Sequence, residues 1–265
     1  DPLVCLTICC LIILGGIGFI VTVDLYNWGR KRVRKEERRP HLTLHTRIVL
    51  VSTASLLVLG TVLTLGLEFD HTLKNLNFWE KLNASFFQSV TARTAGYATI
   101  PQGELGDATK LVTIILMFIG ASPSSTGGGI KTTTFVVLVA TVVSISRGWD
   151  ETVINKRRVD KSVVYRAMTI VAMAFLVIAI TSGVIMVTTP PEVSAIDAVY
   201  EAVSAFGTVG LTTGLTPDLS IVAKILVMLT MFIGRVGPIS LVLALTMKHS
   251  GGPGKILPEG KVIVG

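Results

Sequence analysis

Long uncharged stretches alternate with short basic segments along this chain. Five stretches hold at most one Asp, Glu, Lys or Arg residue each, and they cover residues 2–23, 48–67, 111–146, 167–191 and 225–247. A helix needs about 20 predominantly apolar residues to cross a bilayer, so each stretch is long enough to form a membrane span. A soluble protein that buried five such stretches within 265 residues would have too little polar surface. The pattern therefore predicts an all-α, multi-pass integral membrane protein.

Two shorter apolar runs, residues 82–92 and 194–206, each precede a Thr-x-Gly loop. Runs of this length cannot cross a bilayer, and we expect them to be helices that enter the membrane and end inside it. Ser194 and Asp197 resemble a capping box at the start of the second helix. The loops that follow lie 114 positions apart, and they read Thr94-Ala95-Gly96-Tyr97 and Thr208-Val209-Gly210-Leu211.

An internal duplication explains this spacing. The same offset of 114 positions aligns Met117–Gly120 with Met231–Gly234. Both loops are similar to the Thr-Val-Gly-Tyr-Gly loop that lines potassium-channel filters, in which backbone carbonyls replace the hydration shell of the ion. Glycine permits the torsion angles that such a loop requires. We therefore predict tandem helix–pore-loop–helix repeats of the potassium-channel type, with potassium ions bound at the eight loop residues. An ordinary glycine turn between hairpin helices is the alternative.

A helix-breaking segment, Ala121–Gly129, interrupts the stretch 111–146. One proline followed by three glycines cannot continue a stable helix. Irregular backbone at membrane depth persists only where it lines a watery cavity or is buried in protein. We therefore expect an intramembrane gate just below the filter. Its residues are Ser124, Ser125, Thr126, Gly127, Gly128, Gly129 and Lys131. A phosphate-binding loop is excluded, because Ile130 stands where that motif requires glycine.

Arg235 stands near the middle of the last uncharged stretch. An arginine at the bilayer centre costs at least about 2.5 kcal/mol, so we expect this side chain to face the pore or the protein interior. It could act with the broken segment as an electrostatic barrier, or it could be a structural hydrogen-bonding centre. For Arg93 we expect a structural salt bridge, with Glu104 as the candidate partner; contact with the ion is the alternative.

The charge distribution predicts which side each loop faces. The net charge is +7; residues 24–47 hold eight Lys or Arg, residues 147–162 hold five, and the tail from Lys248 adds three. The positive-inside rule predicts that these segments, including the C-terminus, are cytoplasmic. The basic run Arg30–Arg39 abuts a span and lacks interleaved aromatics, so we expect contact with anionic membrane lipid and no nucleic-acid partner. No catalytic constellation or metal-ligand spacing is present, and we expect no enzyme activity.

Taken together, these motifs resemble the Trk/Ktr/HKT superfamily of potassium-translocating subunits, and its KtrB branch in particular. The segments that carry the resemblance are Arg93–Tyr97, Ser122–Thr132, Phe232–Pro238 and Pro258–Gly265. The resemblance implies four repeats around one pore, of which this chain holds two complete ones. The expected divisions are 1–29 (inner helix of a preceding repeat), 30–146 and 147–248 (pore-loop repeats) and 249–265 (cytoplasmic tail).

The resemblance further implies the ion-translocating subunit of a potassium uptake system in a bacterial plasma membrane. It implies a homodimer and a cytosolic RCK-type regulatory subunit, through which alone a nucleotide would act. Sodium is a candidate coupling ion. Two other functions remain open: a tandem-pore potassium channel, and a non-conducting membrane scaffold or sensor.

Overall fold

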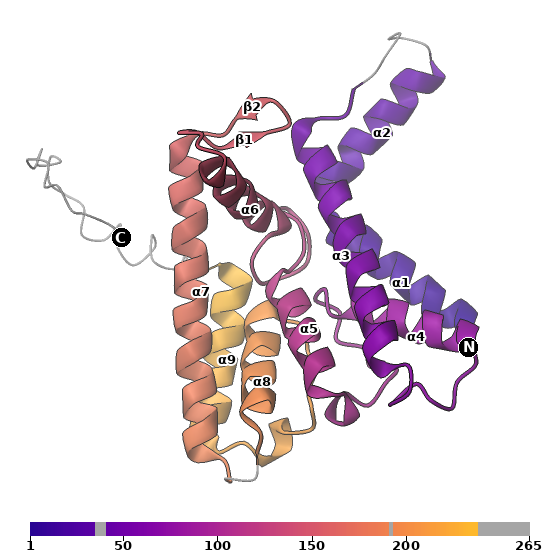
Figure 1. Cartoon of the computed structure of the whole chain (residues 1–265), viewed down its shortest axis with the longest axis vertical. Helices are drawn as coiled ribbons and strands as arrows, with labels where there is room; N and C mark the ends of the chain where they lie inside the picture. Colours follow the sequence, from indigo (N-terminus) through magenta and orange to yellow (C-terminus); the bar gives the residue numbers. More distant parts are fainter. Residues whose placement is uncertain (35–40, 191–192, 238–265) are drawn as a thin grey trace, which may run out of the picture.

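The computed structural model describes residues 1–34, 41–190 and 193–237, and its secondary structure is almost entirely helical (Figure 1). The elements follow in the order α1 (Pro2–Gly16), α2 (Phe19–Val33), α3 (Leu44–Glu68), α4 (Phe78–Thr91), η1 (Gln102–Glu104), α5 (Asp107–Phe118), α6 (Thr132–Ser146), β1 (Val153–Ile154), β2 (Arg157–Arg158), α7 (Lys161–Thr188), α8 (Ala195–Gly207), η2 (Thr216–Asp218) and α9 (Ile221–Val236). The all-α membrane fold predicted from the sequence is confirmed.

Two helices of the described chain, α3 and α7, are long and apolar enough to cross a membrane. They each pack against a short helix, α3 against α4 and α7 against α8. Helix α9 packs against both α7 and α8, whereas α5 lies between α3 and α8. The order of a long helix, a short helix, a loop and an inner helix therefore occurs twice, and α5 joins the two halves that Figure 1 shows side by side.

The expected span at residues 2–23 is wrong as a single element. The structure divides it into α1 and α2, which are bent by 96° relative to each other. Gly18 makes the bend, with φ 85° and ψ 152°, a conformation that is essentially restricted to glycine. A Cβ atom at this position would lie 2.5 Å from the carbonyl oxygen of Pro123. The bend is therefore fitted against the segment between α5 and α6.

The expected interruption of the stretch 111–146 is confirmed, because α5 ends at Phe118 and α6 begins at Thr132. We call the residues between them, 119–131, the intramembrane segment. The last inner helix also ends earlier than expected. Helix α9 stops at Val236, and Gly237 has φ 89°, so Arg235 lies in the last turn rather than in the middle of a helix. Residues 238–247 of the expected span lie outside the described residues.

Helix α4 begins at Phe78, four residues before the apolar run that predicted it. A capping box explains the difference: the side chain of Asn77 accepts from the backbone N–H of Glu80, and the backbone N–H of Asn77 donates to the side chain of Glu80. Helix α8 begins after Ser194 as expected, but no side-chain cap forms there. Its Asp197 carboxylate instead lies 2.8 Å from the Nζ atom of Lys110, which ties α8 to the first turn of α5.

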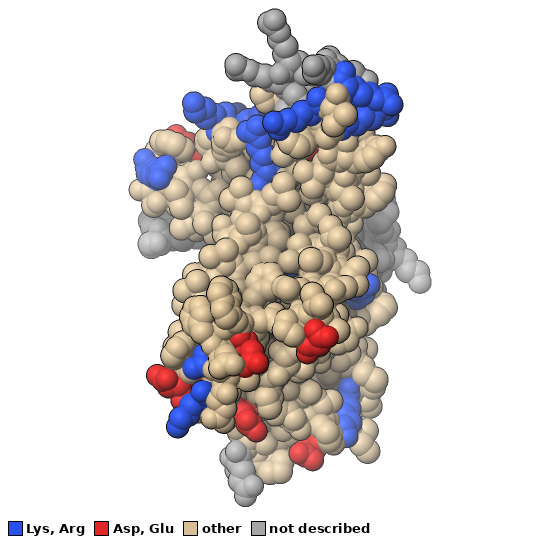
Figure 2. Space-filling view, turned by 90° about the vertical axis from the view of Figure 1, so that its right-hand side faces the viewer, with Lys and Arg blue, Asp and Glu red and all other residues tan. Residues whose placement is uncertain are grey.

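The basic residues gather at one end of the molecule. Arg30, Lys31 and Arg32 close α2, and Arg157 and Arg158 form β2. Both elements lie at the top of Figure 1, and Figure 2 shows that Lys and Arg concentrate at this end while Asp and Glu lie mainly toward the other. This separation is consistent with a membrane orientation set by charge. Residues 35–39 of the basic run, the tail from Lys248 and the expected division 249–265 lie outside the described residues.

The bend at Gly18 gives a test of this fold. We predict that Gly18→Ala lowers the free energy of unfolding by about 1–3 kcal/mol, because alanine is strained at this backbone conformation. Its Cβ would also approach the Pro123 carbonyl. Gly16→Ala is the matched control, since a Cβ there meets no atom within 4 Å. Thermal unfolding of the detergent-purified variants measures both. Equal stability of the two variants would contradict the observed bend.

Candidate functional site

The two Thr-x-Gly loops follow α4 and α8 and share an unusual backbone. Thr94 and Gly96 have φ angles of 72° and 78°, and Thr208 and Gly210 have 52° and 93°. Each loop thus has left-handed backbone at the same two positions, the threonine and the glycine two residues later. Positive φ is rare for a β-branched residue such as threonine and carries strain. The repeated strain marks both loops as functional candidates.

The loops are in direct contact with each other. A Cβ atom on Gly96 would lie 2.1 Å from the carbonyl oxygen of Val209 and 3.1 Å from the Cα atom of Gly210. A Cβ atom on Gly210 would come no closer than 3.8 Å to Gly96. The two glycines stand at equivalent positions of the Thr-x-Gly motif, but they differ in the space around them. Gly96 is required by both torsion and space, whereas Gly210 is required mainly by torsion.

Each loop is fixed to the helix that precedes it. The Thr91 hydroxyl donates to the carbonyl of Tyr97 at 2.6 Å, and the Ser204 hydroxyl donates to the carbonyl of Leu211 at 2.6 Å. These bonds hold the last residue of each loop against the final turns of α4 and α8. Because a helix C-terminus carries partial negative charge, both helices present a favourable potential to a cation at the loops.

The intramembrane segment passes directly beside the threonine ends of the two loops. A Cβ atom on Gly127 would lie 2.5 Å from the Oγ1 atom of Thr94, and one on Gly128 would lie 2.3 Å from the Oγ1 atom of Thr208. Two adjacent glycines thus allow the segment to touch both loops at once. The residues that the sequence assigned to a filter and to a gate are therefore brought together by the fold.

The bend between α1 and α2 and the end of α9 both meet the intramembrane segment, which itself separates α5 from α6. The backbone N–H of Ser122 donates to the carbonyl of Gly16 at 3.1 Å, and the N–H of Phe19 donates to Ser124 at 3.0 Å. On the other side, the N–H of Gly129 donates to the carbonyl of Gly234 at 3.3 Å. Groups left unpaired where α1 and α9 end or bend are thereby bonded to the segment. Its irregular backbone is supported from both sides, as irregular backbone in a membrane must be.

Three cationic side chains donate to backbone carbonyls of the segment, Lys131 from within it and Arg93 and Arg235 from other elements. The Arg235 guanidinium donates to the carbonyl of Thr126, and Lys131 Nζ donates to the carbonyl of Gly127 at 2.5 Å. Arg93 donates to the carbonyl of Gly120 at 3.4 Å and is only 7% exposed. The expected salt bridge from Arg93 to Glu104 is wrong, because the side chain turns toward the intramembrane segment instead. The carbonyls freed by the helix break attract all three cations.

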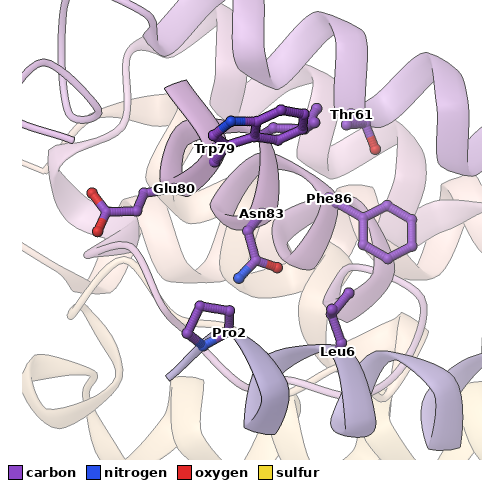
Figure 3. Close-up of a pocket in the computed structure, with 8 residues that line it drawn as sticks. Pro2, Leu6, Thr61, Trp79, Glu80, Asn83 and Phe86 are labelled. Carbon is purple, nitrogen blue, oxygen red and sulfur yellow. The ribbon is translucent and has the colours of Figure 1, made fainter. Parts of the chain in front are cut away.

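Two hollows of similar size differ in what they offer a cation. The first, about 490 Å³, lies between α1 and the first loop; its walls include Arg93, Thr94, Ala95, Tyr97 and Thr126. The second, about 470 Å³, is shown in Figure 3, where Asn83 lies between Pro2, Leu6 and Phe86. Its other walls include Trp79 and Thr61; it is largely apolar, and no residue of either loop lines it. Only the first hollow adjoins the loop backbone, and we take it as part of the candidate ion site.

The sequence did not reveal the buried polar residues that support the loops from behind. Gln88, Gln102, Tyr200 and Glu201 are each no more than 5% exposed. Their partners lie on other elements, so no local pattern identifies them. One signal was present: Gln88 and Glu201 are polar residues inside the short apolar runs, near the same point in the two repeats. A polar residue at such a position is costly unless it is hydrogen-bonded.

Comparisons with known proteins identify a family and several relatives. A family model described as "TrkH: Cation transport protein" matches residues 1–252. The chain is 37% identical over its full length to the Ktr system potassium uptake protein B of Bacillus subtilis (strain 168), of which it covers 57%. It is 38% identical over 96% of its length to the potassium/sodium uptake protein NtpJ of Enterococcus hirae, of which it covers 56%. The chain thus spans just over half the length of these relatives.

A solved structure shows the same fold. The crystal structure of the potassium transporter TrkH from Vibrio parahaemolyticus matches 94% of this chain with a TM-score of 0.69, and this chain covers 53% of it. The sequence identity of that match is 18%, so the likeness concerns the fold alone.

Proposed function

Because the chain belongs to the TrkH family of cation transport proteins, we propose that it forms part of the ion-translocating membrane subunit of a potassium uptake system. The observation that carries this proposal is the pair of matched loops. Both have positive φ angles at the same threonine and glycine positions, follow a short helix, and contact the intramembrane segment through the threonine. The names of the relatives, which are potassium or potassium/sodium uptake proteins, support the same class of substrate.

In this proposal potassium loses its hydration water between the loops Thr94–Tyr97 and Thr208–Leu211. Backbone carbonyls replace the lost water oxygens, and the helix C-termini of α4 and α8 favour the positive charge. Two loops enclose only part of an ion. We therefore propose that further pore loops, on a part of the protein outside this chain, complete the ring, as the four-repeat architecture requires. The division 1–29 then corresponds to the inner helix of a preceding repeat, bent into α1 and α2, of which α2 continues to Val33. The divisions 30–146 and 147–248 correspond to two full repeats.

The intramembrane segment is proposed to be the gate. Its glycines 127 and 128 touch the inner threonines of both loops, so an ion leaving the loops must pass this segment. Arg235 holds the segment through the Thr126 carbonyl and places a positive charge beside the path. Opening would require the segment to move away from Thr94 and Thr208. The segment donates backbone N–H groups to the carbonyls of Gly16 and Gly234. Once the segment moves, water can donate to these carbonyls in its place.

The remaining parts of the proposal concern a second ion, the partners and the orientation. The name of the Enterococcus hirae protein includes sodium, which supports sodium as a second or coupling ion. The name "Ktr system" describes a system of several components, which supports a separate regulatory subunit. We propose a homodimer with a cytosolic nucleotide-binding regulator of the RCK type at the basic end of the molecule, with the C-terminus on that side. These relatives are transport proteins, and we propose no enzymatic reaction.

A tandem-pore potassium channel is the second candidate function. A fixed cation beside the path disfavours it, because rapid conduction requires low barriers along the pore. Rescue of a potassium-uptake-deficient bacterium at low external potassium tests transport of either kind. We expect growth with the full-length protein and none with an empty vector. Failure to rescue, with the protein present in the membrane, would favour a non-conducting scaffold or sensor.

We predict that Gly96→Ser and Gly210→Ser both reduce the preference for potassium over sodium. The reduction should be on the order of tenfold for Gly96, which corresponds to about 1.4 kcal/mol of discrimination. It should be smaller for Gly210, because a Cβ there has more space. The measurement is the uptake affinity for each of the two ions. Gly183→Ser on α7 is the control, because a Cβ atom at Gly183 would meet no atom within 4 Å. Unchanged selectivity in both variants would remove these loops from the ion path.

Arg235→Ala is predicted to increase potassium flux, because it removes a positive charge and frees the Thr126 carbonyl. Lys224→Ala on the same helix is the control: this lysine also donates to a backbone carbonyl, that of Pro217, but at the opposite end of α9. Flux and thermal stability should be measured on the same purified sample. Normal flux together with lower stability would show that Arg235 is a structural hydrogen-bonding centre rather than a barrier.

Deletion of residues 126–129 is predicted to raise flux while preserving the preference for potassium over sodium. The deletion removes the two glycines that touch the threonine ends of the loops and leaves the loops themselves intact. Flux in reconstituted vesicles gives the result. A well-folded deletion variant with flux at or below that of the wild type would argue against a gate.

A further inference from the structure

Helix α8 carries two consecutive buried polar residues. Tyr200 is fully buried and Glu201 is 5% exposed. Consecutive residues of a helix point about 100° apart, so these side chains reach in different directions from the same turn. Buried polar groups must be hydrogen-bonded to offset the cost of leaving water. The partners of this pair therefore show what the two residues hold.

Glu201 holds the chain that follows the second loop. One carboxylate oxygen accepts from the hydroxyl of Thr212, the residue directly after Leu211, and the other accepts from the hydroxyl of Thr216 at 3.1 Å. Thr212 also accepts from the N–H of Gly214 at 3.0 Å. The carboxylate thus fixes the outer end of the second loop to α8 at two points.

Tyr200 reaches in the other direction, to the first repeat. Its hydroxyl donates to the Oε1 atom of Gln102 at 2.8 Å. The same oxygen accepts from Gln88 of α4 at 2.6 Å, and the amide nitrogen of Gln102 donates to Gln88 at 3.1 Å and to the carbonyl of Ile100 at 2.6 Å. All four bonding positions of the Gln102 amide are used, so its orientation is fixed. Gln102 lies just beyond Tyr97, at the outer end of the first loop.

The two anchored segments touch each other. A Cβ atom on Gly103 would lie 2.7 Å from the carbonyl oxygen of Thr213. Gly103 follows Gln102, and Thr213 follows Thr212, so the contact joins the two residues that α8 holds. A change at either anchor therefore acts on the spacing between the outer ends of both loops.

We propose that Tyr200 and Glu201 are positioning residues that set the preference for potassium over sodium by holding the outer ends of both loops from one helix. This inference rests on the proposed function of the loops. Discrimination between the two ions requires the carbonyl oxygens to keep the spacing that suits potassium, whether by cavity size or by the number of oxygens held in place. Neither side chain contacts the ion; both act through Gln102, Thr212 and Thr216.

The test uses the full-length protein reconstituted in lipid vesicles, with apparent affinities for potassium and for sodium measured separately. Tyr200→Phe removes one hydroxyl, and Glu201→Gln replaces the acceptor oxygen of either Thr212 or Thr216 by an amide. Each should lower the potassium-to-sodium affinity ratio by about threefold or more. Tyr165→Phe on α7 and Glu104→Gln on η1 are controls, because both side chains are exposed. The ratio in these controls should equal that of the wild type.

Two further variants guard against loss of folding. Thr216→Val removes one donor to Glu201, and Gln102→Leu removes the partner of Tyr200; each should lower the same ratio. In addition, Tyr200→Phe combined with Gln102→Leu should lower it no more than Gln102→Leu alone, because both act on one bond. Reduced stability with an unchanged ratio across these variants would overturn the inference and leave the two residues a structural role only. A wild-type protein that does not transport potassium would overturn the proposed function and the inference with it.

Discussion

The structure depends on one constraint: backbone that is not helical must find hydrogen-bond partners inside the protein when it lies at membrane depth. The intramembrane segment 119–131 is the clearest case. At the bend between α1 and α2, the N–H of Ser122 donates to the carbonyl of Gly16, and the carbonyl of Ser124 accepts from the N–H of Phe19. On the other side, the N–H of Gly129 donates to the carbonyl of Gly234 in α9. Each break in a helix thus supplies partners for another. The bend, the segment and the end of α9 therefore meet at one place, in contact with the two loops.

Glycine makes this convergence sterically possible. Gly96 lets the first loop contact the second, and Gly127 and Gly128 let the segment contact both. Gly234 performs the same task between helices, because a Cβ atom there would lie 1.8 Å from the carbonyl oxygen of Phe206. Close approach of backbones leaves carbonyl oxygens as the main polar groups at the site. A site of this composition suits a dehydrated monovalent cation better than a transition metal, which prefers nitrogen and sulfur ligands.

Local sequence was sufficient to predict several elements. The hydrophobic pattern predicted the spans at α3 and α7 and the short helices α4 and α8, and the proline and glycines of residues 121–129 predicted the break between α5 and α6. Local sequence failed where a distant partner decides. The bend at Gly18 depends on the carbonyl of Pro123, and the direction of Arg93 depends on the carbonyl of Gly120. Pro123 lies about a hundred positions from Gly18, and Gly120 lies about thirty positions from Arg93. A hydrophobic periodicity does not extend over such separations. The anchors on α8 were missed for the same reason, since Tyr200 binds Gln102 in the other repeat.

The central claim is that a cation binds between the two loops, immediately beside the intramembrane segment. Anomalous diffraction from crystals of the full-length protein grown in rubidium or thallium salts, ions that substitute for potassium, would test it directly. We expect the strongest peaks at coordination distance from carbonyl oxygens of both Thr94–Tyr97 and Thr208–Leu211. Peaks that lie elsewhere, with none between the loops, would contradict the account.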